Sequence, residues 1–165
     1  MHVIPFLLKE LEQEANTTRK FFKLLKPEDF QWKPHEKSMT IKQLASHIAE
    51  LPGWIDFAIN TNGIDFEKMP YEPPKANNSE DLLKILEGSV KKATDALLSV
   101  RNEDDLLQTW TIQNGEQIIA AMTKFESLRV SYSQTTHHRA QLGVYLRLLN
   151  IPVPQSYGPT ADEPF

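Results

Sequence analysis

The sequence contains no cysteine, few glycines and no long apolar run. Because none of its 165 residues is a cysteine, a disulfide framework, a thiolate metal site and a protein thiol nucleophile are all excluded. Any bound metal ion must then be held by histidine, carboxylate or amide groups. No apolar stretch approaches the roughly 18 residues that a membrane-spanning helix needs, so we expect no membrane partner.

The chain also lacks a block of basic residues. It carries 18 Lys and Arg against 22 Asp and Glu, a net charge of −4, and we therefore expect no nucleic-acid partner. The first twelve residues have neither the basic start nor the small-residue cleavage site of a signal peptide. A cytoplasmic protein is the expectation.

What the sequence does contain is typical of a soluble globular protein. Hydrophobic residues make up 40% of the chain and charged residues 24%, and glycine occurs only 6 times. A chain of 165 residues is the size of one ordinary domain, so we expect a single domain over residues 1–165 with one core.

Apolar residues recur at intervals of three and four along four segments, which is the pattern of amphipathic helices. Thr40 and Ser79 are the expected N-caps of the second and third helices. The predicted fold class is all-α, a four-helix bundle with long connections after helices two and three. The predicted helices are 4–25, 40 to about 55 with a pause at Pro52-Gly53, 79–100, and about 120–150.

The segments between the predicted helices are expected to be loops. Residues 60–78 are rich in proline and asparagine and predict a long loop of the kind that often forms a binding edge. Within 101–117, Trp110 to Gly115 has the alternation and turn residues of a small hairpin, but too few residues flank it for a sheet. The tail 155–165 could lie against the bundle.

Two adjacent histidines, His137 and His138, stand out in the last predicted helix. His138 shares a face with Gln134 and Leu142, one turn to either side, and this face should point toward the core. His47, in the second helix, also falls within or beside the apolar stripe. A bundle that brings His47 and His138 together would supply two ligands of a metal site. An inward histidine is, however, also often an ordinary core residue.

Three segments carry a resemblance to a known family. LASHI at 44–48, HHRAQL at 137–142 and the continuation GVYLR at 143–147 together resemble the DinB-like family of bacterial helical-bundle proteins, over essentially the whole chain. The resemblance implies a divalent metal ion, most often zinc or nickel, and a homodimer. The family's metal triad is one histidine from the second helix and a pair four apart on the last, which carries over to His47, Gln134 and His138.

Glutamine at position 134 departs from the family pattern. The site could bind metal more weakly through the amide oxygen, a neighbour such as His137 or Glu50 could replace the missing imidazole, or the pocket could have lost its metal. Glu50 is expected first as a surface acid, with ligand or supporting partner as alternatives. His137 is expected beside the site or at an interface, and Arg139 at the surface or in an ion pair.

The resemblance implies two classes of function. The first is a divalent-metal-dependent transferase that joins a low-molecular-weight thiol to a small electrophile, with metal-assisted hydrolysis as a variant. The second is a non-catalytic metal-binding or small-ligand-binding protein linked to stress, and a purely structural bundle is a third alternative. No catalytic residue is assigned from the sequence.

Overall fold

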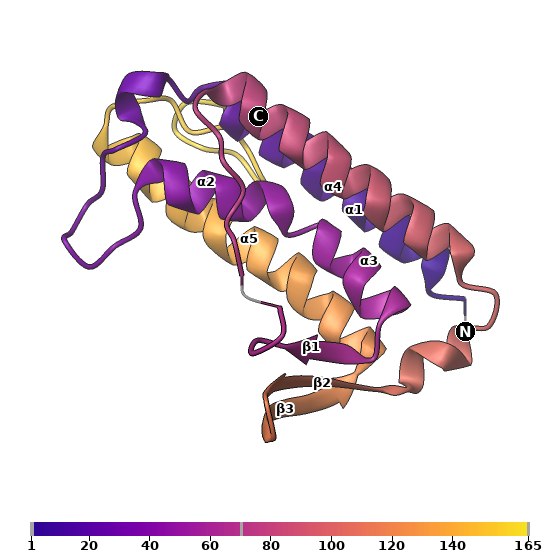
Figure 1. Cartoon of the computed structure of the whole chain (residues 1–165). Coiled ribbons are helices and arrows are strands. Elements are labelled where there is room, and N and C mark those ends of the chain that lie inside the picture. Colours follow the sequence, from indigo (N-terminus) through magenta and orange to yellow (C-terminus); the bar gives the residue numbers. More distant parts are fainter. Residues whose placement is uncertain (1, 70, 165) are drawn as a thin grey trace.

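The structure, a computed structural model, describes residues 2–69 and 71–164. Met1, Pro70 and Phe165, which fall in the N-terminal segment, long loop and tail considered above, lie outside the described residues. Within the described part of the chain there are five α-helices and a three-stranded sheet (Figure 1). The elements are α1 (Ile4–Phe22), η1 (Pro27–Asp29), α2 (Ile41–Glu50), α3 (Gly53–Asn60), β1 (Gly63–Asp65), α4 (Ser79–Ser99), η2 (Glu103–Leu107), β2 (Thr109–Asn114), β3 (Gln117–Thr123) and α5 (Lys124–Leu148).

The helices pack around an apolar core. α1 lies along α4, and α2 and α3 follow one another along α5 while also contacting α4 (Figure 1). Phe22, Leu44, Ile55, Leu86 and Leu142, one from each helix, are essentially inaccessible to solvent. The prediction of a mostly helical chain is confirmed. None of the described helices is long and apolar enough to cross a membrane.

The predicted second helix is in fact two helices. Its start is confirmed, because Thr40 Oγ1 accepts from the Gln43 N–H at 3.2 Å and Gln43 Oε1 accepts from the Thr40 N–H at 2.9 Å. α2 ends at Glu50, and α3 begins at Gly53 after Pro52, which has no N–H to continue a helical ladder. The predicted pause is therefore a helix boundary.

The N-cap of α4 is Asn78, so the prediction of Ser79 is wrong by one residue. Asn78 Oδ1 accepts from the Asp81 N–H at 2.8 Å. The Ser79 hydroxyl instead donates to the carbonyl oxygen of Phe22 at 2.6 Å, and this bond ties the start of α4 to the end of α1.

The all-α class is wrong, because the segment judged too short for a sheet forms one. β2 and β3 pair as an antiparallel hairpin around Gly115, whose φ of +59° suits a tight turn, and β1 adds a parallel third strand. Asp65, the last residue of β1, accepts from the N–H of Gly115 at 2.9 Å and of Glu67 at 3.1 Å. A strand distant in the sequence thus supplies the support that the hairpin alone lacks.

α5 starts later than predicted, at Lys124 rather than near Ala120, because Gln117–Thr123 is strand β3. The boundary is set by a capping box in which Glu126 accepts from the Thr123 N–H at 2.7 Å and Thr123 Oγ1 accepts from the Glu126 N–H at 3.1 Å.

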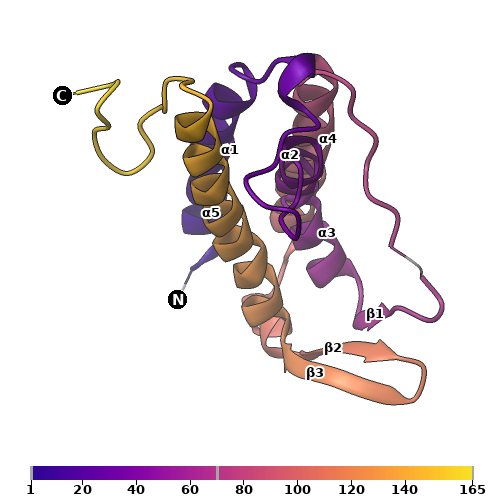
Figure 2. The ribbon, with the colours of Figure 1, turned by 90° about the vertical axis from the view of Figure 1, so that its left-hand side faces the viewer.

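The C-terminal tail is bonded to the helices, as expected, while its loop projects from the side of the bundle (Figure 2). The Tyr157 hydroxyl donates to Glu14 Oε1 on α1 at 2.8 Å, and Arg147 on α5 pairs with Asp162 at 2.5 Å. The tail therefore contacts both the first and the last helix.

Candidate functional site

Two histidines from different helices lie against each other between α2 and α5. His47 lies near the end of α2 and His138 in the second half of α5, and their ring centroids are 4.9 Å apart with the planes inclined at 73°. Both residues are partly shielded from solvent. The structure thus brings together the two imidazoles that the sequence singled out.

A carboxylate fixes the orientation of His47. Glu50 Oε1 lies 2.7 Å from His47 Nδ1, and since a carboxylate only accepts hydrogen bonds, Nδ1 carries the proton and neutral His47 keeps its lone pair on Nε2. The Tyr71 hydroxyl donates to the same oxygen. Partial burial, followed by this contact with Glu50, raises the pKa of Tyr71 above its ordinary value, so the hydroxyl stays protonated.

The Glu50 side chain is only 17% exposed, so its expected role as a solvated surface acid is wrong. Its carboxylate is instead bonded to His47 and to Tyr71, from the loop before α4.

Hydrogen bonds through the side-chain amide of Gln141 fix the orientation of His138. Its Nδ1 lies 2.9 Å from Gln141 Oε1, and Gln141 Nε2 in turn lies 3.2 Å from His137 Nε2. His138 therefore donates through Nδ1 and keeps the lone pair on Nε2. The Gln141 amide N–H donates to Nε2 of His137. Burial lowers the pKa of His138, and the neighbouring His47 and His137 act in the same direction, which favours the neutral ring at pH 7.

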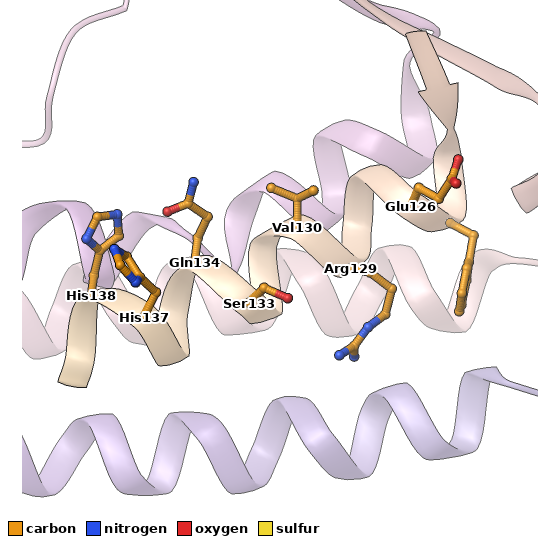
Figure 3. A pocket seen from close by; sticks show the side chains of 8 residues that line it. Glu126, Arg129, Val130, Ser133, Gln134, His137 and His138 are labelled. Atoms are coloured by element: carbon orange, nitrogen blue, oxygen red, sulfur yellow. The ribbon is translucent and has the colours of Figure 1, made fainter. Parts of the chain in front are cut away.

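Gln134 lies one turn before His138 on the same side of α5. In Figure 3 the two side chains point the same way, in line with Val130, whereas Ser133 points elsewhere. Gln134 also lines a small cavity together with His47. The amide is therefore the third polar group at the meeting point of α2 and α5.

Comparison with known proteins identifies the family. The family model described as the DinB family matches residues 3–164. The chain belongs to the DinB family. No curated protein matches it.

Solved DinB-like structures share the fold. A DinB-like protein from Bacillus subtilis is 17% identical with a TM-score of 0.70, covering 90% of this chain and 96% of its own. A DinB-like protein from Bacillus cereus is 20% identical with the same TM-score of 0.70, over 91% and 95% of the two chains. A protein assigned to the DinB family from Exiguobacterium sibiricum is 23% identical, again at 0.70, over 94% and 97%.

The donor set of this DinB-family chain fits a divalent ion only if an amide takes part. Among residues 2–69 and 71–164, no group of three His, Cys, Asp or Glu side chains is arranged to hold a metal ion. Two imidazoles with Nδ1 bound to an oxygen acceptor and Nε2 left for coordination are nevertheless the usual form of metal-binding histidines. His47, His138 and the Gln134 oxygen together offer three protein ligands, the number found in catalytic zinc sites.

Some functional residues were not identified from the sequence. Tyr71 lies in a proline-rich loop without periodicity, and Trp110, Ile112 and Met122 come from the hairpin. Gln141 had a usable signal, because it lies three residues after His138 on one helix.

Two residues near the motif serve packing. Arg139, expected at the surface or in an ion pair, is buried and pairs with Glu14 at 2.6 Å, so only the second alternative is correct. Tyr145 is buried against Trp32, with ring centroids 5.5 Å apart, and its hydroxyl donates to the carbonyl oxygen of Met39 at 3.3 Å.

Proposed function

We propose that this DinB-family protein binds a divalent metal ion through Nε2 of His47 and His138, with the side-chain oxygen of Gln134 as third ligand. The observation that carries the proposal is the pairing of two imidazoles whose Nδ1 atoms are both held by oxygen acceptors. Hydrogen bonds of this kind fix the tautomer and increase the basicity of the free nitrogen. Zinc and nickel both accept imidazole nitrogen.

The surrounding residues of the chain orient these ligands. Glu50 holds the His47 ring, and Tyr71 holds Glu50 in turn. Gln141 holds the His138 ring and engages His137, which keeps His137 from serving as a ligand. The orientation of both imidazole rings is therefore set by hydrogen bonds to the chain's own residues.

We further propose that the chemistry is the transfer of a low-molecular-weight thiol to a small electrophile. A divalent ion bound at this site would lower the pKa of a coordinated thiol, so that a thiolate is present at neutral pH. The chain has no cysteine of its own, so the sulfur must come from a soluble thiol. In the transfer a carbon–sulfur bond forms, the leaving group departs with its bonding electron pair, and the thiol proton passes to solvent.

Metal titration tests the first step. Protein purified without a histidine tag and stripped with a chelator should bind one zinc or nickel ion per chain by calorimetry. At a free metal concentration of about 100 Kd, binding should stabilise the fold by about 2.7 kcal/mol. His138→Ala should abolish this effect and His137→Ala should leave most of it. Absence of a stoichiometric ion and of thermal stabilisation would refute the metal proposal.

Turnover tests the second step. The zinc-loaded and nickel-loaded protein is mixed with cysteine, glutathione or coenzyme A and with 1-chloro-2,4-dinitrobenzene, and thioether formation is followed by absorbance. The expected result is a metal-dependent rate that His138→Ala removes. Stoichiometric metal binding without turnover of any of these thiols would count against an enzyme and favour a metal-binding protein.

A further inference from the structure

A small cavity lies directly beside the paired histidines. It has a volume of about 160 Å³, is partly open to solvent, and is bounded by the α2–α3 junction, the sheet and α5. Its apolar lining consists of Leu51, Trp54, Trp110, Ile112, Met122 and Val130. In Figure 2 the hairpin β2–β3 lies beyond the end of α3 and the start of α5.

Most polar groups in these walls already have partners. The Trp110 indole N–H donates to Thr61 Oγ1 at 3.0 Å, and the Ser131 hydroxyl donates to the Leu51 carbonyl oxygen at 2.6 Å. Both side chains therefore present carbon to the cavity. The polar groups left along its lining are His47 and Gln134 toward α2, and the hydroxyl of Ser127.

The size and lining of the cavity define a class of ligand. An apolar cavity of about 150 Å³ lined by aliphatic and aromatic side chains stays dry and takes up benzene. This cavity, at about 160 Å³, has room for the same body of roughly six carbon atoms. A charged or strongly hydrogen-bonding group placed among the apolar side chains would lose its hydration and would find partners only at the His47, Gln134 and Ser127 edge.

We propose that the cavity binds a compact apolar group of the substrate, a phenyl ring or a short branched alkyl chain, with the reacting end of the molecule at His47 and Gln134. The placement of the reacting end rests on the proposed function, whereas the binding of the apolar group does not. The sheet residues Ile112 and Met122 then determine how large a group is accepted. The hairpin thus acts as the selective wall of the site.

Benzene binding to the metal-free protein tests the proposal. In the presence of a chelator, benzene should cause saturable shifts of the backbone amide signals of β2, β3 and the first half of α5 in two-dimensional NMR. Ser127→Leu, which fills the cavity from α5, should weaken benzene binding at least tenfold. Val144→Leu, at a 58% exposed position on the same helix, is the matched control and should bind as the wild type does.

A second variant protects the test against misfolding of the first. Met122→Ala enlarges the cavity and should shift the preference from benzene toward naphthalene by at least tenfold. The proposal is overturned if the wild type shows no saturable benzene binding, or if Met122→Ala leaves the benzene-to-naphthalene ratio unchanged.

The same experiment separates this proposal from the proposed function. His138 does not line the cavity, so His138→Ala should lose metal binding and keep benzene binding. Metal binding without benzene binding would reject only the apolar subsite, and benzene binding without metal would reject only the metal site.

Discussion

On the proposed function, Gln134 is the ligand that limits metal affinity. An amide oxygen is a weaker ligand for zinc than an imidazole nitrogen, and Gln134 points to the same side of α5 as His138 (Figure 3). Gln134→His should therefore tighten zinc binding at least about tenfold, or about 1.4 kcal/mol, in competition with a chromophoric chelator. Ser133→His, one position away and pointing elsewhere, should leave the affinity unchanged. Equal affinities for Gln134→His and the wild type would remove position 134 from the ligand set.

On the proposed function, Glu50 affects metal affinity through His47. Replacing its carboxylate by an amide removes the negative charge from the acceptor that lies 2.7 Å from His47 Nδ1, so the free Nε2 becomes less basic. Glu50→Gln should lower zinc affinity about 10-fold to 100-fold, and Tyr71→Phe, which removes only the hydroxyl bonded to Glu50, should lower it less. The matched control is Asp56→Asn, because Asp56 bonds to Asn60 and not to the histidines. An effect of Asp56→Asn equal to that of Glu50→Gln would point to a general charge effect instead.

The two imidazoles could be predicted because helical periodicity fixes which way a side chain points. His47 and His138 each fall on an apolar stripe, and the stripes of neighbouring helices must face one another. Tyr71 could not be predicted in this way, because a loop has no period that relates position to direction. The hydrogen bond between Tyr71 and Glu50 could not be predicted for the same reason.

At the scale of elements, Asp65 holds the hairpin to β1. Hydrogen bonds, first from the Gly115 N–H and then from Lys68, lower its pKa from 3.8 to about 2. A carboxyl with a lowered folded-state pKa stabilises the fold above its unfolded pKa, and this stabilisation is lost as the pH falls through the folded value. The stability of the wild type should therefore decline between about pH 4 and pH 2 in part through this group.

Asp65→Asn should be less stable than the wild type at pH 7 and should show a shallower decline toward pH 2, measured by urea unfolding at each pH. Asp95→Asn is the control, since Asp95 pairs only with Lys91 on the surface of α4. Parallel stability profiles for Asp65→Asn and the wild type would show that the carboxylate does not stabilise the hairpin.

The strands of the sheet differ in how far the sequence around each of them predicts it. The alternation from Trp110 and the turn at Asn114-Gly115 indicated possible strand character, because period and turn chemistry are local, but the segment was expected to be an irregular connection. The third strand is only three residues long and pairs in parallel with residues nearly fifty positions away. A segment of three residues is too short to show a period, so neither β1 nor the three-stranded sheet could be predicted from the sequence. The late start of α5 has another cause, because Gln117–Thr123 pairs with β2 as strand β3.

At the scale of the whole molecule, a buried ion pair joins the first and last helices. Arg139, with its side chain 2% exposed, donates to Glu14 Oε2 at 2.6 Å, to the Glu14 carbonyl oxygen at 3.1 Å and to Thr18 Oγ1 at 3.2 Å. Removing one partner of such a pair leaves the other charge buried alone, so Arg139→Ala should lower the free energy of unfolding by about 3–5 kcal/mol.

Urea unfolding at pH 7 measures this loss. Arg147→Ala, which breaks the exposed pair with Asp162, is the comparison and should cost far less. Replacing both members, Arg139→Met with Glu14→Leu, should recover much of the lost stability, because no charge is then left unpaired. A similar loss for Arg139→Ala and Arg147→Ala would show that burial does not distinguish the two pairs.

The approximate extent of most helices could be predicted from the sequence. Amphipathic segments must bury their apolar faces against one another, and prolines and N-caps mark where they end. Arg139 shows the limit of this reasoning, since a charged residue in a helical pattern is expected at the surface unless its partner is known. Its partner Glu14 lies on the first helix, and no local pattern relates the two.

The position of the tryptophans has an optical consequence. Of the 3 in the chain, Trp54 and Trp110 line the cavity, whereas Trp32 lies against Tyr145 away from it. Excitation at the red edge of indole absorption therefore reports mainly on the cavity once Trp32 is replaced by phenylalanine. The fluorescence of Trp54 and Trp110 can therefore report in real time, without an added label, whether a ligand occupies the cavity beside His47.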